Sequence, residues 1–261
     1  MEMKCNSLLA WQGGKSRLAH TIIERMPEHT TYCEVFAGAA WVLFGKAPSK
    51  AEIINDINRE LVTLYRCVQH HLPALAEQFR WMLVAREEFD RFMATPVEVL
   101  TDIQRAARFF YVMKTSFGAK VRGPTFGATH TQPPRLNLLR IEEDLSAAHL
   151  RLARVLVECR PWSEVIDRFD SAGTLFYLDP PYWGCENDYG LGLFERDDFA
   201  RMAEQLTRVK GRFILSLNDT PGVREVFARF HIESVKTRYS INSNVNDRGK
   251  AVPEVLITNY R

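Results

Sequence analysis

The sequence predicts an α/β domain built on a largely parallel β-sheet that is covered by helices. Short runs of strand-forming residues alternate with longer amphipathic stretches along most of the 261 residues, as a parallel sheet requires. The length and an apolar content of 46% are sufficient for one large core. Residues 59–135 depart from this alternation and predict an inserted, mostly helical lobe that ends in a loop rich in Gly, Pro and Thr.

Six runs predict strands, and helical patterns lie between most of them. The strands are expected at Tyr32–Phe36, Glu52–Asn55, Val155–Glu158, Leu175–Leu178, Phe213–Leu217 and Val255–Thr258. The clearest helices are expected at Ser16–Arg25, Arg59–His70, Ile141–Leu156 and Arg196–Val209. Because open parallel sheets bind ligands beyond the carboxyl ends of their strands, the residues that follow the strands are the candidates for function.

The first two strand ends carry residues suited to ligand binding. The first strand leads into FAGAA at residues 36–40, where small side chains let a backbone approach a ligand closely. Tight helix packing would explain the same residues. The second strand ends at Asp56, which is placed to accept hydrogen bonds from ribose hydroxyls or, alternatively, to cap the next helix.

The third strand end is the sequence TLFYLDPPYWG at residues 174–184. A buried strand stops at Asp179, because Pro180 and Pro181 cannot continue the ladder of hydrogen bonds. A plain turn would account for this much. Tyr182 and Trp183 add two large rings directly after a stiff corner, which favours a cleft where a flat ligand stacks.

A fourth candidate lies near the N-terminus, in LLAWQGGKSRLA at residues 8–19. Its Gly-Lys-Ser is not a phosphate-binding P-loop, because Leu9 stands where that motif needs its first glycine. Gly13 and Gly14 lead to Lys15 at a helix start, which would bring backbone amides and an ammonium to a carboxylate. A simple loop leading into a helix is the alternative.

The charge distribution points to a nucleic-acid partner more clearly than the formal net charge of +2. Between residues 103 and 141 there is no acidic residue but there are seven basic ones: Arg105, Arg108, Lys114, Lys120, Arg122, Arg135 and Arg140. Basic runs are often only solvated surface. One so one-sided, interleaved with Phe117 and Phe126, favours contacts with phosphates.

The cysteines and the apolar runs indicate the cellular environment of the protein. The five cysteines are scattered without metal-ligand spacing, which predicts reduced thiols and no metal site. No apolar run approaches the length of a membrane span, and the N-terminal apolar part is too short for a signal peptide. We therefore expect a cytoplasmic protein that does not contact membranes.

Taken in order, these motifs resemble the Dam-type, alpha-class DNA adenine methyltransferases. The matching pieces span the chain nearly end to end: Trp11-x-Gly13-Gly14-Lys15, Phe36-x-Gly38, Asn55-Asp56-Ile57-Asn58, Asp179-Pro180-Pro181-Tyr182, LSLNDT at 215–220 and YSINSN…VPEVLITNY at the end. The resemblance implies a Rossmann-like methyltransferase sheet made of residues 1–58 and 136–261, with a target-recognition lobe at 59–135. It also implies S-adenosylmethionine as cofactor, double-stranded DNA as partner and a bacterial or phage origin.

The resemblance also implies roles for the Asp-Pro-Pro-Tyr residues. The amino nitrogen of adenine is a poor nucleophile because its lone pair is delocalised into the ring. The Asp179 carboxylate and the Pro180 carbonyl would accept its two hydrogens, with Pro181 holding that carbonyl in place and Tyr182 stacking on the base. The adenine must be flipped out of the duplex to reach such a pocket. Neither a metal nor a covalent intermediate is required.

For the cofactor, the resemblance assigns Trp11 and Lys15 to the methionine end, with Asp179 nearby. It assigns Phe36 and Gly38 to the turn beneath the cofactor, and Asp56 to the ribose. Contacts with DNA are expected from the loop at residues 114–130, with Lys114, Lys120 and Arg122 as the candidates.

Two departures from the family pattern bear on these expectations. Ala40 stands where members often have a second glycine, and we expect cofactor binding to tolerate its methyl group. Ala10 and a shortened loop stand where members that methylate GATC commonly have Lys and Tyr-Asn-Gly-x-x-Arg, so a GATC recognition sequence does not carry over. The Asp-Pro-Pro-Tyr motif alone would also suit a cytosine amino group, RNA or a protein glutamine, and an idle DNA-binding module is a further alternative.

Overall fold

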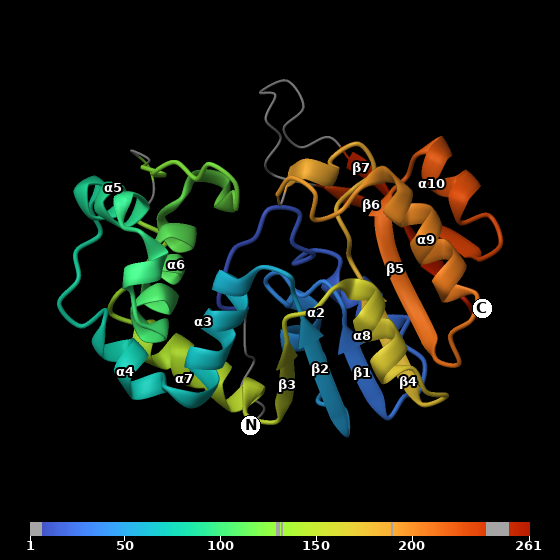
Figure 1. Cartoon of the computed structure of the whole chain (residues 1–261), viewed down its shortest axis with the longest axis horizontal. Helices are drawn as coiled ribbons and strands as arrows, with labels where there is room; N and C mark the ends of the chain where they lie inside the picture. Colours follow the sequence, from blue (N-terminus) through green and yellow to red (C-terminus); the bar gives the residue numbers. More distant parts are fainter. Residues whose placement is uncertain (1–6, 129–130, 132, 189, 239–250) are drawn as a thin grey trace.

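A computed structural model describes the chain except for residues 1–6, 129–130, 132, 189 and 239–250. The SINSN part of the closing motif lies outside the described residues. Figure 1 shows the sheet on one side of the molecule and a helical lobe on the other.

The centre of the fold is a seven-stranded sheet in the order β3-β2-β1-β4-β5-β7-β6. Its strands are β1 (Thr31–Glu34), β2 (Ala51–Asn55), β3 (Val155–Glu158), β4 (Thr174–Leu178), β5 (Arg212–Asn218), β6 (His231–Arg238) and β7 (Ala251–Thr258). Strands β1 to β5 pair in parallel, whereas β7 runs antiparallel to both β5 and β6. All six predicted strands are confirmed, although β1 ends two residues earlier than expected.

The sequence analysis missed β6, which lies at one edge of the sheet. Its residues HIESVKTR mix charged and apolar side chains, and Val235 is its buried hydrophobic residue among those whose burial is described. An edge strand has a single neighbour in the sheet, so it does not need the continuous apolar run that marks a central strand.

Helices cover both faces of the sheet. They are α1 (Ala19–Glu24), α2 (Trp41–Gly45), α3 (Arg59–His70), α7 (Ile141–Leu152), α8 (Trp162–Phe169), α9 (Arg196–Leu206) and α10 (Pro221–Val226). The prediction for α3 is confirmed at both ends. The helix predicted at Ile141–Leu156 ends at Leu152, because Val155 already pairs with Glu52 in the parallel ladder between β3 and β2.

Alternate residues of the strands point into two hydrophobic clusters. Tyr32 of β1 and Tyr177 of β4 belong to the cluster that contains α1, α2, α3 and α7. Their neighbours Cys33 and Phe176 belong to the cluster beneath α8 and α9. This alternation follows from the two-residue period of a β-strand and explains why β4 is buried along its whole length.

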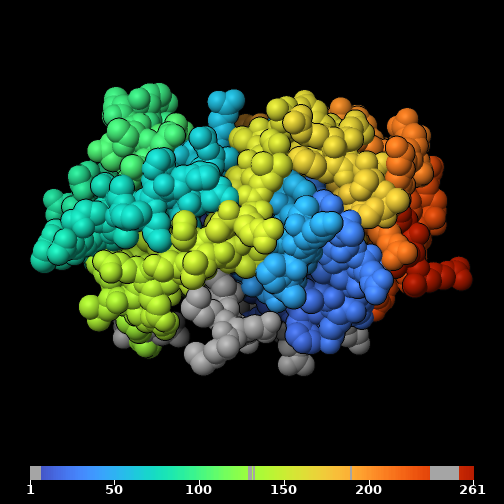
Figure 2. Space-filling model, turned by 90° about the horizontal axis from the view of Figure 1, so that it is seen from below, coloured from blue at the N-terminus to red at the C-terminus, as the bar shows by residue number. Residues whose placement is uncertain are grey.

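The helical lobe consists of α4 (Leu72–Glu77), α5 (Arg86–Ala94), the short helix η1 (Val97–Val99), α6 (Asp102–Thr115) and η2 (Phe117–Ala119). Helix α3 packs against α6 on the lobe side and against α7 and β3 on the other. Figure 2 shows the underside, where the cyan and green lobe meets the yellow-green and blue parts of the chain. The first hydrophobic cluster runs through both parts without interruption.

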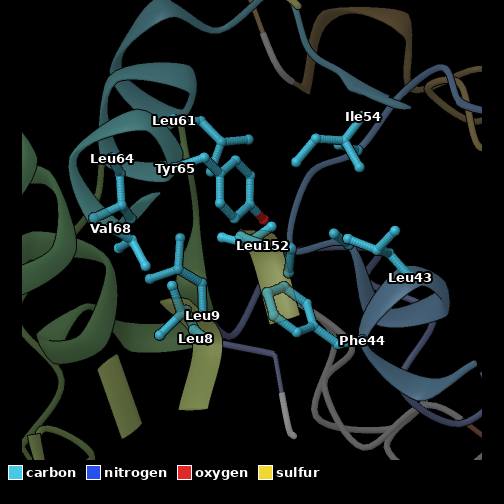
Figure 3. Packing of buried hydrophobic residues seen from close by; sticks show 14 of the residues in the cluster. Leu8, Leu9, Leu43, Phe44, Ile54, Leu61, Leu64, Tyr65, Val68 and Leu152 are labelled. Atoms are coloured by element: carbon cyan, nitrogen blue, oxygen red, sulfur yellow. The ribbon is translucent and has the colours of Figure 1, made fainter. Parts of the chain in front are cut away.

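The N-terminal segment lies inside this junction. In Figure 3, Leu8 and Leu9 lie beside Leu64 and Val68 of α3, with α2 on the opposite side. Both leucines are at most 3% exposed. The residues that follow them, from Trp11 to Lys15, are thereby fixed between the lobe and the sheet.

Candidate active site

The carboxyl ends of β1, β2 and β4 meet at a pocket of about 740 Å³, a volume that includes space open to solvent. Its lining includes every residue that the sequence assigned to the cofactor: Trp11, Lys15, Phe36, Gly38, Asp56 and Asp179. Pro181 lines it as well, whereas Pro180, which is buried, and Tyr182 are not among the lining residues. The structure thus brings together residues that are up to 170 positions apart because parallel strands end at the same edge of a sheet.

The turn after β1 explains the small residues of FAGAA. Gly38 has a φ of +47°, and a Cβ atom there would lie 2.8 Å from Nε1 of Trp11. The Tyr65 hydroxyl donates a hydrogen bond to the Gly38 carbonyl at 2.6 Å. Ala40 is also left-handed, with a φ of 50°, although it is not glycine. The glycine at 38 is therefore required both by backbone conformation and by the close approach of Trp11.

Asp56 is held by backbone amides. Its Oδ2 accepts a hydrogen bond from the Gly38 amide and its Oδ1 accepts one from the Asn58 amide, both at 2.9 Å. Burial raises the pKa of Asp56, while these hydrogen bonds lower it. The helix cap that was the alternative role for Asp56 belongs to Asn58, whose Oδ1 accepts from the amides of Glu60 and Leu61.

Asp179 follows β4 and is hydrogen-bonded on one oxygen from two sides. Its Oδ1 lies 2.6 Å from the Lys15 ammonium and accepts a hydrogen bond from the Ser216 hydroxyl at 3.0 Å. Burial raises the pKa of Asp179, and Lys15 is the main group that opposes this rise. The Lys15 side chain is 3% exposed, and its Nζ lies 4.7 Å from the centre of the Tyr182 ring. Lys15 therefore joins the predicted cofactor residues to the predicted base-binding residues.

The loop after the double proline is anchored by the LSLNDT motif. Asn218 accepts from the Trp183 amide at 2.9 Å and donates to the Trp183 carbonyl at 3.0 Å. The indole ring packs 5.0 Å from the Phe199 ring, with the Arg196 guanidinium 4.1 Å from its centre. Trp183 is thus a structural anchor, and it is not among the residues that line the pocket.

The segment from Trp11 to Lys15 also contacts the helical lobe. The Gln12 amide donates to the Ala119 carbonyl at 3.3 Å, and its side chain donates to Asp188 at 3.2 Å. The Trp11 ring lies 6.4 Å from the ring of Phe109 in α6. One short segment therefore contacts the lobe, the turn at Gly38 and Asp179 at the end of β4.

The basic loop forms a small hairpin after α6. The Phe117 amide donates to the Thr125 carbonyl at 2.7 Å, and the Gly127 amide donates to the Thr115 carbonyl at 2.8 Å. Lys120 and Arg122 lie exposed near its tip. Within the described part of the chain, neither has an ion-pair partner.

Four of the seven basic residues have partners inside the protein. Arg105 pairs with Glu60, Arg140 pairs with Glu143 at 3.2 Å, and Arg108 donates to the Phe92 carbonyl at 2.6 Å. Lys114 is half-buried with its ammonium 5.4 Å from the Phe110 ring centre, and burial lowers its pKa. A DNA contact by Lys114 stays a prediction. The exposed basic residues of this stretch are Lys120, Arg122, Arg135 and Arg140, of which Arg140 pairs with Glu143.

Several residues of the pocket had no predicted role, among them Glu34 and Ile57. Glu34 is only 2% exposed at the end of β1, where its Oε2 accepts hydrogen bonds from the Tyr32 hydroxyl and the Leu43 amide. Burial raises its pKa to about 8. Ile57 is 42% exposed where it lines the pocket beside Asp56. The available signal for Glu34 was an acid inside the apolar run YCEVF, which the analysis passed over.

Three further features of the described residues bear on the sequence predictions. They contain no cluster of three or more His, Cys, Asp or Glu side chains that could hold a metal ion. None of the helices in this part of the chain is long and apolar enough to cross a membrane. The four described cysteines are free thiols.

Comparison with known proteins identifies relatives along the whole chain. A type II methyltransferase, M.MjaIII of Methanocaldococcus jannaschii, is 26% identical, and the match covers 99% of this chain and 100% of the relative. The DNA adenine methylase of Escherichia coli K12 is also 26% identical, with 97% of this chain and 95% of that protein covered. The solved structure of a SAM-dependent O-methyltransferase from Thermotoga maritima matches 95% of this chain and 65% of that chain, with 12% identity and a TM-score of 0.39.

A family model decides the assignment. The model that describes D12 class N6 adenine-specific DNA methyltransferases matches residues 11–241, a span that contains the pocket, the hairpin and the Asp-Pro-Pro-Tyr motif. The chain therefore belongs to the D12 class of N6 adenine-specific DNA methyltransferases, which take their methyl group from S-adenosylmethionine.

Proposed function

We propose that the pocket holds S-adenosylmethionine beside a flipped-out adenine of duplex DNA, and that Asp179 and the Pro180 carbonyl bind the adenine amino group. The observation that carries this proposal is the contact between Lys15 and Asp179. In the resting protein the Asp179 carboxylate already accepts hydrogen bonds from an N–H donor in the pocket. An adenine amino group offers the same kind of donor at the same place.

Two acceptors on one amino group make it a better nucleophile. Hydrogen bonds from both amino hydrogens draw the nitrogen lone pair out of the ring and toward the sulfonium methyl group. Positioning the nitrogen in line with that methyl supplies much of the remaining acceleration. Asp179 does not have to be a strong base, because the methylated ammonium, conjugated with a purine, loses its proton readily.

The proline corner and Tyr182 complete the base site. Pro180 and Pro181 each have a fixed φ, which holds the Pro180 carbonyl in one orientation. The Lys15 ammonium lies over the Tyr182 ring and also contacts the Asp179 carboxylate, which brings Tyr182 near Asp179, although Tyr182 is not among the residues that line the pocket. We assign Tyr182 to stacking on the adenine, which must leave the duplex to reach this depth.

The remaining lining residues suit the cofactor. Each Asp56 oxygen accepts one backbone hydrogen bond, which leaves further lone pairs for the two ribose hydroxyls. Gly38 and Phe36 form the floor of the pocket, and Trp11 with Lys15 bounds the methionine end. These assignments rest on the lining of one continuous pocket.

The helical lobe is the proposed target-recognition part. We assign this role to residues 59–135, with the catalytic part made of residues 1–58 and 136–261. Lys120 and Arg122 at the hairpin tip are exposed and unpaired within the described chain, so both are available to double-stranded DNA. We place the activity in the cytoplasm, because that is where a bacterial or phage enzyme meets its DNA.

The proposal is tested with the Asp179→Asn substitution. We expect methyl transfer to a mixed DNA substrate to fall at least about a hundredfold, because the charged carboxylate acceptor at the reacting nitrogen becomes a neutral and weaker amide oxygen. The dissociation constant of S-adenosylmethionine, measured by calorimetry, should change little. Asp219→Asn is the matched control, since Asp219 pairs with Arg224 and is not among the pocket residues. An Asp179→Asn enzyme with more than about a tenth of wild-type turnover would contradict this role.

A further inference from the structure

The pocket contains more carboxyl groups than cations. Among the described residues, its lining contains three carboxyl groups, on Glu34, Asp56 and Asp179, and a single cation, Lys15. Lys15 lies 2.6 Å from Asp179, and Asp56 accepts two backbone amide hydrogen bonds. Within the described part of the chain, the pocket supplies no cation to Asp56 or Glu34, but both Asp56 oxygens accept backbone hydrogen bonds, whereas only one oxygen of Glu34 accepts any.

The geometry of Glu34 leaves one of its oxygens available. Both of its hydrogen bonds, from the Tyr32 hydroxyl at 2.8 Å and the Leu43 amide at 3.0 Å, go to Oε2. No described residue donates a hydrogen bond to Oε1. The side chain is 2% exposed and lines the pocket, so a ligand in the pocket is the partner that Oε1 can still acquire.

The cation outside the pocket that acts on Glu34, Lys46, is already engaged. The Lys46 ammonium donates to Glu52 at 2.6 Å, to the Ser49 hydroxyl at 2.7 Å and to the Ala47 carbonyl at 2.8 Å. These three bonds use all the donors that a lysine has. Lys46 therefore lowers the pKa of Glu34 only weakly, and burial raises that pKa to about 8.

Glu34 also lies near the reacting end of the pocket. The Asp179 carboxylate is close enough to contribute to the raised pKa of Glu34. The sulfonium of the cofactor must lie near Asp179, because its methyl group has to face the amino nitrogen that Asp179 holds. The sulfonium, which needs a negative counter-charge, would therefore lie in the part of the pocket that contains the buried Glu34 carboxyl group.

We propose that Glu34 is the counter-charge for the sulfonium of S-adenosylmethionine and makes the pocket favour this charged donor over its neutral thioether product. The inference rests on the proposed function, in which this pocket binds the cofactor. In the empty pocket Glu34 is mostly protonated near neutral pH. Binding of the sulfonium releases that proton to solvent, and loss of the positive charge after methyl transfer returns a proton to Glu34.

The tyrosines and the cysteine around Glu34 do not titrate in the same range. Burial raises the pKa of Tyr32 and Cys33 on β1, of Tyr65 on α3 and of Tyr177 on β4, so these four groups stay neutral. The remaining neighbours are Asp179 on β4, Lys46 after α2 and Lys15. Asp179 is thus the other acid at the reacting end, and a variant of Glu34 separates the two.

The test is calorimetric titration of the full chain at pH 7 in buffers that differ in ionisation enthalpy. We expect S-adenosylmethionine to release close to one proton and S-adenosylhomocysteine to release almost none. Between pH 6 and pH 8 the affinity for S-adenosylmethionine should rise by up to about tenfold per pH unit, since one ionisation is linked to binding. Both effects should disappear in Glu34→Gln, which retains an oxygen acceptor for Tyr32 and Leu43.

Tyr32→Phe is a second variant that leaves the carboxyl group in place. The Tyr32 hydroxyl hydrogen bond lowers the pKa of Glu34, so its removal should move the pH profile of S-adenosylmethionine binding to higher pH. This variant keeps the test decisive if Glu34→Gln does not fold. An unchanged profile in Tyr32→Phe would count against the inference.

Other outcomes would overturn the inference outright. Equal proton release by both compounds would assign Glu34 to the amino group that they share. A Glu34→Gln enzyme that keeps the pH dependence would assign the proton to another acid, such as Asp179. Failure of the wild-type chain to bind S-adenosylmethionine at all would instead contradict the proposed function.

Discussion

Single residues in the pocket combine a structural and a chemical task. Asp56 holds the turn at Gly38 and the start of α3 through two backbone amides, and the same carboxylate is proposed to bind the ribose. Ser216 supports Asp179 in a similar way, because its hydroxyl donates to the Asp179 carboxylate and is itself in contact with the Tyr177 hydroxyl at 3.1 Å. Variants of these residues must therefore be measured for both unfolding stability and ligand affinity.

The Asp56→Asn substitution should weaken cofactor binding. A hydrogen bond to a charged acceptor is worth about 1.5 to 3 kcal/mol, which corresponds to a roughly 10- to 100-fold increase in the dissociation constant. Calorimetry with S-adenosylmethionine measures this change, and thermal unfolding without cofactor reports any structural loss separately. Wild-type affinity in a folded Asp56→Asn protein would remove Asp56 from the ribose site.

The Ala40→Gly substitution should stabilise the protein. A left-handed backbone destabilises a non-glycine residue by about 1 to 2 kcal/mol. Glycine avoids this strain but lowers stability by about 0.5 to 1 kcal/mol, because the unfolded chain has more freedom to lose on folding. We expect a gain of up to about 1 kcal/mol in the free energy of unfolding, measured by denaturant titration. Ala39→Gly is the matched control, because Ala39 is equally buried without a positive φ and should lose stability. A larger loss in Ala40→Gly than in Ala39→Gly would refute this account of the turn.

At the scale of elements, the hairpin after α6 carries exposed basic side chains on the lobe. Ser116 and Phe126 form an isolated β-bridge, and the Phe126 ring packs 5.7 Å from Phe89 of α5. The base of the hairpin is therefore fixed to the lobe while Lys120 and Arg122 remain exposed. Such an arrangement presents basic groups on a rigid support.

Alanine substitutions at Arg122 and Lys120 should have different effects. An Arg that forks onto a guanine gives about 1 to 3 kcal/mol of discrimination, so Arg122→Ala should relax specificity at one base position. Lys120→Ala should weaken binding equally on all sequences and make the salt dependence shallower by about one unit of slope. Methylation of a randomised duplex library and binding at several salt concentrations measure the two effects.

Arg140→Ala is the control for this pair. Arg140 belongs to the same basic stretch but already pairs with Glu143, so we expect little change in affinity or site preference. If Arg122→Ala and Lys120→Ala behave like Arg140→Ala, the hairpin does not read DNA.

At the scale of the whole molecule, the carboxyl groups buried in the pocket make the free energy of unfolding depend on pH. Burial raises the pKa of Glu34 from 4.5 to about 8, and it raises the pKa of Asp56 and Asp179 as well. The folded state then binds protons more tightly than the unfolded state between these values. Stability is therefore fully present below the ordinary pKa and is lost as the pH rises toward the raised one.

We expect the melting temperature of the unliganded protein to fall as the pH is raised from about 5 to about 8. Acids whose pKa is lowered, such as Glu52 and Glu233, act below this window and do not oppose the trend. The decline should be shallower in Glu34→Gln. A difference between the two proteins that stays constant across the whole range would contradict a raised pKa for Glu34.

The sequence by itself determined the order of the central strands along the chain and the edge at which the site lies. Apolar runs mark buried strands through local periodicity, and parallel pairing then forces Asp56, Asp179 and the turn at Gly38 to one edge of the sheet. The assignment to a methyltransferase family also followed from motifs in order. The edge strand β6 was not predicted, because its sequence contains no continuous apolar run.

Only the tertiary structure decided which side chains meet. It placed Lys15 on Asp179, gave the helix cap to Asn58 and brought the buried Glu34 into the pocket. It also showed which basic residues of the stretch from 103 to 141 have a partner among the described residues. These outcomes depend on contacts between residues far apart in the chain, whose distances and burial are set by packing and leave no local pattern in the sequence.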